Sequence, residues 1–299
     1  MGPTAFRCRR GRSLRFRIGV RSSVAFSLAL FGACAPAAPE PGVDTTGPRI
    51  VAMVPSLSEL VIAMGAGAHL VARTDHDTDP ASSHLPSVGG GLDPSLEVLV
   101  ALDVDVVLTT SARETAALAQ RLGDLGIETR VLPTNTLEDV FAAIESLGAL
   151  LDVEEAADSL SRSLKDGLTE VSERVAGLPA VTALYVVWYD PPMTTGGGTF
   201  IDDLMGVAGG ANVFADLPAA WPNVGFESIV ARNPDVVLWP AGEAEDLVGF
   251  VQSLPGWRDL PAVRAGRVAF VDARALNRPG PGLVESARVL ARALHPEVF

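Results

Sequence analysis

Residues 97–108 read EVLVALDVDVVL, and residues 227–238, 130 positions further on, read ESIVARNPDVVL. In both copies a glutamate comes first, Val-Ala follows three residues later, and Asp-Val-Val-Leu begins eight residues after the glutamate. Each copy predicts a short helix, a turn at Asp103 or at Asn233-Pro234, and then a buried strand. One chain therefore contains the same helix-to-strand unit twice.

The sequence around both copies alternates short apolar runs with amphipathic segments. This alternation favours parallel sheets flanked by helices. A capping box at Ser56–Glu59 is expected to start a helix directly after the first strand. We expect strands at 49–54, 70–73, 105–110, 128–132, 181–189, 235–239 and 267–272, and further helices at 95–102, 112–124, 199–207, 225–232, 243–251 and 281–294.

Residues 137–176 break this alternation, because they are rich in Ala, Leu, Glu and Ser and contain no proline. We expect two consecutive helices there, at 137–150 and 153–176, and the second is long enough to span about 35 Å. The predicted fold is α/β, with two lobes that each have a central, mainly parallel sheet flanked by helices, bridged by one long α-helix. The expected boundaries are 48–150 for the N-terminal lobe, 151–177 for the connecting helix and 178–299 for the C-terminal lobe.

The first 33 residues carry seven arginines and no acidic residue, and an apolar run follows at 23–33. This pattern predicts a signal peptide at 1–33 and an exported protein. Phe31-Gly32-Ala33-Cys34 resembles a bacterial lipobox, which implies that Cys34 is lipidated and anchors the protein to a membrane through a tether at 34–47. The alternative is an ordinary signal peptide cleaved nearby. The location is then periplasmic or at the cell surface.

Composition excludes several function classes. Without the arginines of the signal peptide, 16 basic residues remain against 36 acidic ones, a net charge of −20 that argues against nucleic-acid binding. No P-loop, G-x-S-x-G or H-E-x-x-H motif is present, so we expect no enzyme. No metal site is expected either, because the four histidines are scattered. Gly196–Gly198 precede a helix and could offer backbone N–H groups to an anion.

Five stretches carry a resemblance that spans residues 48–297: RIVAMVPSLSELVIAMGAG, DPSLEVLVALDVDVVL, WYDPPMTTGGGTFIDDLMGVAGGANVF, WPNVGFESIVARNPDVVLW and GWRDLPAVRAGRVAFVD. They resemble ABC-transporter substrate-binding proteins of the helix-bridged class, most closely those for vitamin B12. The resemblance implies a monomeric receptor that delivers its ligand to an ABC permease dimer with its ATPase subunits. It also implies that Glu97 and Glu227 dock into arginine pockets of the permease. Alternatively, both glutamates only favour the dipoles of their helices.

The resemblance places the ligand between the lobes. Trp188, Tyr189 and Trp221 lie at predicted loop mouths, where aromatic faces can hold a large planar ligand, although core packing would also explain them. His76 falls where relatives often carry a ligand-contacting tyrosine, and Arg278 can meet an anionic group. A corrinoid, vitamin B12 or cobinamide, is the expected ligand, with no other cofactor; a ferric siderophore or haem is the alternative. The candidate ligand contacts are Pro55, Ser56, His76, Gly90, Gly91, Trp188, Tyr189, Trp221, Asn277 and Arg278.

Overall fold

The computed structural model describes residues 47–111, 113–241, 247–272 and 276–299, which belong to one compact unit, Val43–Phe299. The predicted signal peptide, Cys34 and all of the tether except Gly47 lie outside the described residues. So does the beginning of the helix expected at 243–251. In the described part of the chain, no helix is both long and apolar enough to cross a membrane.

The first lobe has a parallel sheet with the strand order β1-β2-β3. Residues alternate along its strands: Ile50 and Leu108 pack in one apolar cluster with α1 and α4, and Val51 and Val107 pack in another with α2 and α3. Helices thus cover both faces of the sheet, which explains why these strands consist mainly of apolar residues. The bounds are β1 (Ile50–Ala52), α1 (Pro55–Ala63), α2 (Leu96–Ala101), β2 (Val106–Thr109), α3 (Ala116–Asp124), β3 (Glu128–Val131) and α4 (Leu137–Leu150).

The second lobe has a mixed sheet with the order β5-β4-β7-β8, and β6 also pairs with β4. Only the pairing of β4 with β5 is antiparallel. Tyr185 and Leu238 face α6 and α11, whereas Leu184 and Val237 face the side of α7 and α9. The bounds are β4 (Val181–Tyr189), β5 (Pro192–Thr194), α6 (Phe200–Val207), β6 (Gly210–Asn212), α7 (Phe226–Arg232), β7 (Val236–Ala241), α8 (Leu247–Ser253), α9 (Pro261–Arg264), β8 (Val268–Asp272) and α11 (Leu283–Leu294).

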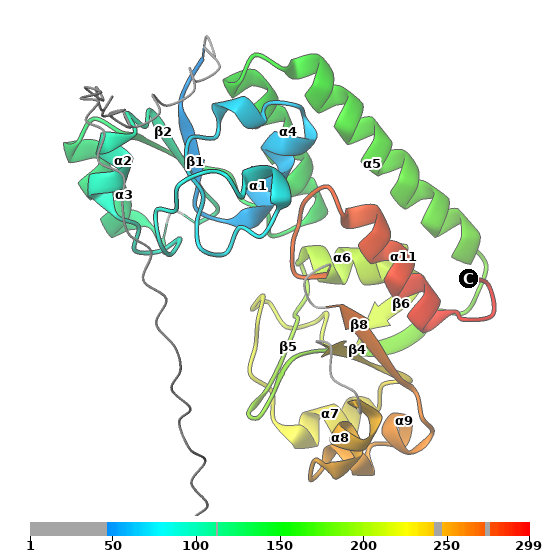
Figure 1. Cartoon of the computed structure of the whole chain (residues 1–299). Coiled ribbons are helices and arrows are strands. Elements are labelled where there is room, and N and C mark those ends of the chain that lie inside the picture. Colours follow the sequence, from blue (N-terminus) through cyan, green and yellow to red (C-terminus); the bar gives the residue numbers. More distant parts are fainter. Residues whose placement is uncertain (1–46, 112, 242–246, 273–275) are drawn as a thin grey trace, which may run out of the picture. The chain divides into compact units, whose positions relative to one another are not determined.

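Helix α5 (Glu154–Val175) is the long helix that the sequence predicts, and it joins the two lobes (Figure 1). It packs against α4 of the first lobe and against α11 of the second. Its buried stripe is Ala157, Leu164, Leu168, Val171 and Val175, at the spacing of one helix face. These residues belong to a single apolar cluster that runs from β1 and α1 to β7 and α11. The two lobes therefore share a core through α5.

Two predictions for the first lobe are wrong. Residues 70–73 are not a strand, because only Leu70 pairs with β1, through an isolated bridge to Ile50, before the chain turns away at Thr74. The capping box is also absent. Helix α1 begins at Pro55, and its cap residue, Val54, offers no side-chain acceptor. Proline suits this first helical position, where its missing N–H is not needed. In the second lobe, the short strands β5 and β6 were not predicted.

The duplicated segments adopt the same conformation. The equivalent residues that follow the two helices have a left-handed backbone, Asp103 (φ 46°) in one copy and Asn233 (φ 43°) in the other. Two positions later, Asp105 accepts a hydrogen bond from the backbone N–H of Arg49 at 2.7 Å, and Asp235 accepts one from that of Thr182 at 3.1 Å. Each copy therefore fastens a helix-to-strand turn to the start of the neighbouring strand.

The hydroxyl of Thr182 should make the stability of the second lobe depend on pH. It donates to Asp235 at 2.6 Å, and this bond is the main reason why the pKa of Asp235 lies below its ordinary value of 3.8. A lowered carboxyl pKa stabilises the fold above the ordinary pKa, and this stabilisation is lost as pH falls through the folded pKa. The stability difference between wild type and Thr182→Val should therefore shrink between about pH 7 and about pH 2.5 in urea unfolding. Thr169→Val, on the exposed side of α5, is the control. A difference that does not change with pH would contradict the prediction.

Candidate functional site

Segments that follow several strands meet at the carboxyl ends of the two sheets. Val54–Ser56 follow β1, Thr110 follows β2 and Thr134 follows β3, while Asn277–Pro279 come after β8 in the second lobe. Together with His76 they line a cavity of about 520 Å³. Because α/β sheets bind ligands beyond the carboxyl ends of their strands, this cavity is the candidate site.

Two further cavities adjoin the first through shared lining residues. One, of about 540 Å³, shares His76 and extends to the glycine loop of the first lobe. The other, of about 310 Å³, shares Asn277 and lies against the second lobe. We call the three cavities together the cleft. Its lining includes Pro55, Ser56, His76, Gly90, Gly91, Asp93, Thr110, Glu114, Thr134, Phe200, Trp221, Asn277 and Arg278.

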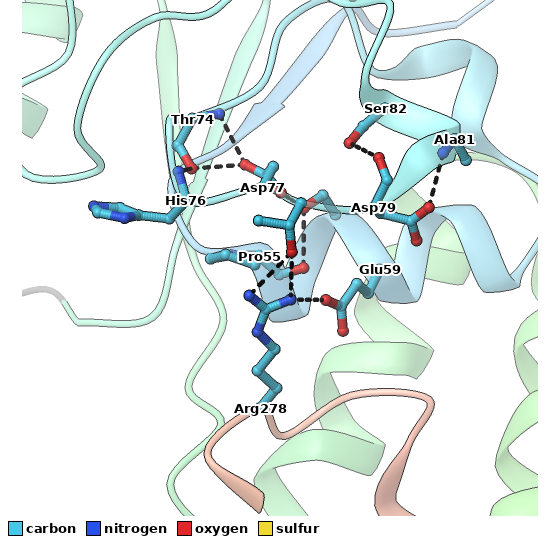
Figure 2. Close-up of polar contacts among 11 residues, drawn as sticks. Pro55, Glu59, Thr74, His76, Asp77, Asp79, Ala81, Ser82 and Arg278 are labelled. Carbon is cyan, nitrogen blue, oxygen red and sulfur yellow. Dashed lines mark hydrogen bonds and ion pairs between the residues drawn. The ribbon is translucent and has the colours of Figure 1, made fainter. Parts of the chain in front are cut away.

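His76 is held at the cleft by the loop around it (Figure 2). The backbone N–H and the hydroxyl of Thr74 donate to the buried carboxylate of Asp77 at 2.8 and 2.6 Å, and the hydroxyl of Ser58 donates to its other oxygen. The hydroxyl of Thr74 also accepts from the backbone N–H of His76 at 3.3 Å. The His76 ring itself is exposed and has no hydrogen-bond partner among the described residues. The hydrogen-bonded loop thus presents an imidazole that is free to bind a ligand.

Arg278 reaches from the second lobe to helix α1 of the first (Figure 2). Its Nη1 lies 2.7 Å from Oε1 of Glu59, and its guanidinium donates weakly to the hydroxyl of Thr78 at 3.4 Å. Glu59 therefore pairs with Arg278 and does not cap its own helix. The two residues are 219 positions apart in the chain.

Asn277 is positioned by a buried tyrosine. The hydroxyl of Tyr185, on β4, donates to Oδ1 of Asn277 at 2.8 Å. Tyr185 is fully buried, and burial raises the pKa of its phenol. The phenol therefore stays a neutral donor, which leaves the amide N–H groups of Asn277 for a ligand.

Replacing Tyr185 by phenylalanine should weaken ligand binding as well as the fold. The ring remains, but Asn277 loses the donor that fixes its orientation. We expect about a fivefold weaker affinity and a free energy of unfolding lower by about 1 kcal/mol. Calorimetric titration and urea unfolding measure the two effects. An unchanged affinity would show that Asn277 needs no such support.

The three aromatic candidates are placed differently. Trp221 is 43% exposed and lines the cleft. Trp188 is 57% exposed, and its indole N–H donates to the carbonyl of Asp190 at 2.8 Å. Tyr189 stacks on Trp188 and lines a separate cavity with Phe226 and Trp257. The structure thus brings Trp221 to the cleft but not Trp188 or Tyr189, whose role as ligand contacts stays a prediction.

The two glycine loops have different roles. Gly91 borders the cleft, and a Cβ there would lie 2.1 Å from the carbonyl oxygen of Met53, so no larger residue fits without a shift of the backbone. Gly90 has open space around it. The N–H groups of Gly196–Gly198 donate to Ala220, Leu217 and Asp202. The anion site suggested by that glycine run is therefore absent, because its donors are used within the protein.

The sequence did not single out Thr110, Thr134 or Tyr185, nor the pairing of Glu59 with Arg278. The two threonines could have been found, because Thr110 ends one predicted strand and Thr134 closely follows another. Nothing local in the sequence marks Tyr185 or Glu59. Among the described residues, no group of three or more His, Cys, Asp or Glu side chains is arranged to hold a metal ion.

Glu97 and Glu227 lie outside the cleft lining, in the first turns of α2 and α7, and both are exposed. The backbone N–H of Glu97 and the hydroxyl of Ser95, which donates at 3.1 Å, hold the pKa of Glu97 below its ordinary value. Glu97 is therefore a fixed negative charge at neutral pH.

Comparison with known proteins identifies the family. Residues 50–275 match the family described as periplasmic binding protein. The chain is a member of this family. Such proteins are solute-binding receptors, so this periplasmic binding protein is not an enzyme. It is 30% identical over 260 residues to the uncharacterized ABC transporter substrate-binding lipoprotein YvrC of Bacillus subtilis, which covers 84% of this chain and 81% of that one. Both matches place the chain among the substrate-binding proteins of ABC transporters.

Other relatives of this periplasmic binding protein bind different ligands. The vitamin B12-binding protein of Vibrio parahaemolyticus is 27% identical over 78% of this chain and 84% of its own. The vitamin B12-binding protein BtuF of Vibrio cholerae has a similar structure, with a TM-score of 0.71 at 23% identity over 83% of this chain and 96% of its own. The haem-binding protein HutB of the same species has a TM-score of 0.73 at 22% identity over 83% and 99%. These two structures confirm the two-lobe fold.

Proposed function

We propose that this receptor captures a corrinoid, cobalamin or cobinamide, in the cleft and delivers it to an ABC permease dimer with its ATPase subunits. The observation that carries the proposal is the chemistry of the cleft lining. Hydroxyl and amide groups of Ser56, Thr110, Thr134 and Asn277 line the first cavity. A corrin ring carries amide side chains around its edge, and such groups bind best to neutral hydrogen-bonding partners.

In this proposal the contacts come from both lobes. Pro55, Ser56 and His76 meet the ligand from the first lobe, with Gly90 and Gly91 along its edge. Trp221, Asn277 and Arg278 meet it from the second lobe, where the indole of Trp221 offers an apolar face. Trp188 and Tyr189 belong to this set if they turn toward a bound ligand. The receptor acts as a monomer, and acylation of Cys34 anchors it to the membrane.

A specific observation supports haem as the second candidate. The ring of His76 is exposed, lines two of the three cavities and has no partner among the described residues. An imidazole in this setting can bind the iron of haem, and it can equally bind the cobalt of a corrinoid. A ferric siderophore would call for several arginines, and the described lining has one.

Calorimetric titration with cyanocobalamin, dicyanocobinamide and hemin tests the proposal. We expect saturable one-to-one binding of a corrinoid at about micromolar affinity or tighter. The preference between the two corrinoids shows whether the lower base of cobalamin is recognised. Tight binding of hemin with no corrinoid binding would support the haem receptor in place of the corrinoid receptor.

A further inference from the structure

The described part of the cleft lining has one strong cation. Among the described residues that line it, Arg278 is the only arginine or lysine, whereas Asp93 and Glu114 are acidic. An unpaired arginine at this place would attract carboxylates and phosphates, which it binds through its fork of N–H donors. The partners of Arg278 therefore determine how tightly the cleft binds an anionic ligand.

Glu59 compensates the positive charge of Arg278. Its carboxylate is 2.7 Å from the guanidinium of Arg278, and the two side chains are only 21% and 26% exposed (Figure 2). A charge pair that is largely removed from water interacts strongly and is only partly screened by salt. An anionic ligand that approaches Arg278 must compete with a carboxylate that is already in place. Asp93 and Glu114 add negative charge to the lining of the adjoining cavity.

We propose that Glu59, by neutralising Arg278, lowers the affinity of the cleft for anionic ligands relative to neutral ones. Glu59 does not itself line the cleft, so it acts as a positioning and charge-compensating residue that works through Arg278. The inference rests on the proposed function in taking the cleft as the ligand site. It also sharpens that proposal, because the amide side chains of a corrin are uncharged, whereas haem carries two propionates.

Matched pairs of probes separate charge from shape. Hemin and hemin dimethyl ester share one ring and differ in the two carboxylates. Dicyanocobinamide and dicyanocobyrinic acid form the corresponding corrin pair, in which peripheral amides are replaced by carboxylates. The readout is the ratio of the two dissociation constants within each pair, measured by absorbance titration of the purified full-length protein at about pH 8, where ordinary imidazoles are neutral.

The wild-type protein should prefer the neutral member of each pair. In Glu59→Gln the affinity for the acidic member, relative to that for the neutral member, should rise by about tenfold, because the charge of Arg278 is then uncompensated. Glu59→Asp, which keeps the charge, should stay near the wild-type ratio. Arg278→Gln leaves Glu59 unpaired, so the relative affinity for the acidic member should fall below that of wild type. In the double variant Glu59→Gln/Arg278→Gln both charges of the pair are removed, and the ratio should return to within about twofold of wild type.

The ratio also guards against indirect effects. The pair joins the two lobes, so its loss can alter closure of the cleft, but altered closure changes the affinity of both members of a probe pair alike. Glu170→Gln, which removes the partner of Arg288 at 3.1 Å between α5 and α11, is the matched control and should leave the ratio unchanged.

The outcomes also separate this inference from the proposed function. If hemin and its ester bind and the corrins do not, the corrinoid proposal fails, while the haem pair still reports on Glu59. If wild type binds none of the four probes, Glu59→Gln should gain binding of the acids. A Glu59→Gln protein that binds the acids no better than wild type overturns the inference, whatever the natural ligand is.

Discussion

Replacing both Glu97 and Glu227 by arginine should abolish transport of the ligand while its dissociation constant stays within about twofold of wild type. The two glutamates are exposed, lie outside the cleft lining, and begin equivalent helices 130 positions apart. Val100 and Val230 follow three residues later in each copy and are 48% and 50% exposed. Each lobe thus presents the same small surface of one acid and one valine. This repetition suits a permease dimer with two equivalent basic pockets.

In the proposed docking, charge reversal would place a cation against each basic pocket, and like charges in contact cost several kcal/mol in an interface. We expect uptake by reconstituted transporter to fall at least about a hundredfold in the double variant and by less in each single variant. Glu138→Arg/Glu154→Arg is the matched control, because both residues are exposed glutamates in first helical turns. Loss of ligand affinity in the Glu97/Glu227 variant, or equal loss of uptake in the control, would show that these acids are not docking residues.

Replacing Leu168 by alanine should lower the free energy of unfolding by about 2–5 kcal/mol. Leu168 is 6% exposed and lies near the middle of α5, in the apolar cluster that both lobes share. Removing its side-chain atoms leaves a cavity between α5 and its neighbours. Leu125→Ala is the matched control, because Leu125 is 47% exposed and its loss should cost less than about 1 kcal/mol.

Urea unfolding followed by two probes tests the prediction. All four tryptophans lie in the second lobe, so their fluorescence reports on that lobe, whereas circular dichroism reports on the helices of both. Because the core is continuous, the two probes should give one coincident transition in wild type and in Leu168→Ala. A fluorescence transition that Leu168→Ala leaves in place, with only part of the dichroism shifted, would mean that the lobes unfold separately.

Local patterns predicted most helices of this receptor. The helix expected at 137–150 has those bounds in the structure, and α5 differs from its predicted range of 153–176 by one residue at each end. Such elements combine an apolar stripe with a cap or a turn residue, and both signals lie within a few residues of each other. The strand at 70–73 failed because an apolar run does not show whether a neighbouring strand stays beside it for more than one residue.

The sequence likewise predicted some residues of the candidate site and not others. Pro55, Ser56 and Asn277 could be nominated because they follow predicted strands, and strand ends of parallel sheets meet at one edge. Trp188 and Tyr189 were nominated as aromatic residues at the end of a predicted strand, yet in the structure they stack on each other and Tyr189 lines a separate cavity. The direction of a side chain depends on what packs around it, which the local sequence does not record.

The α/β class, the duplicated helix-to-strand unit and the long connecting helix follow from the sequence alone, because each depends on residue spacing along the chain. The pairing of Glu59 with Arg278 and the support of Asn277 by Tyr185 come from the folded structure. These partners are 219 and 92 residues apart, and they meet because the folding of both lobes brings them together. The charge of the cleft, and with it the class of ligand, is therefore a property of the folded receptor.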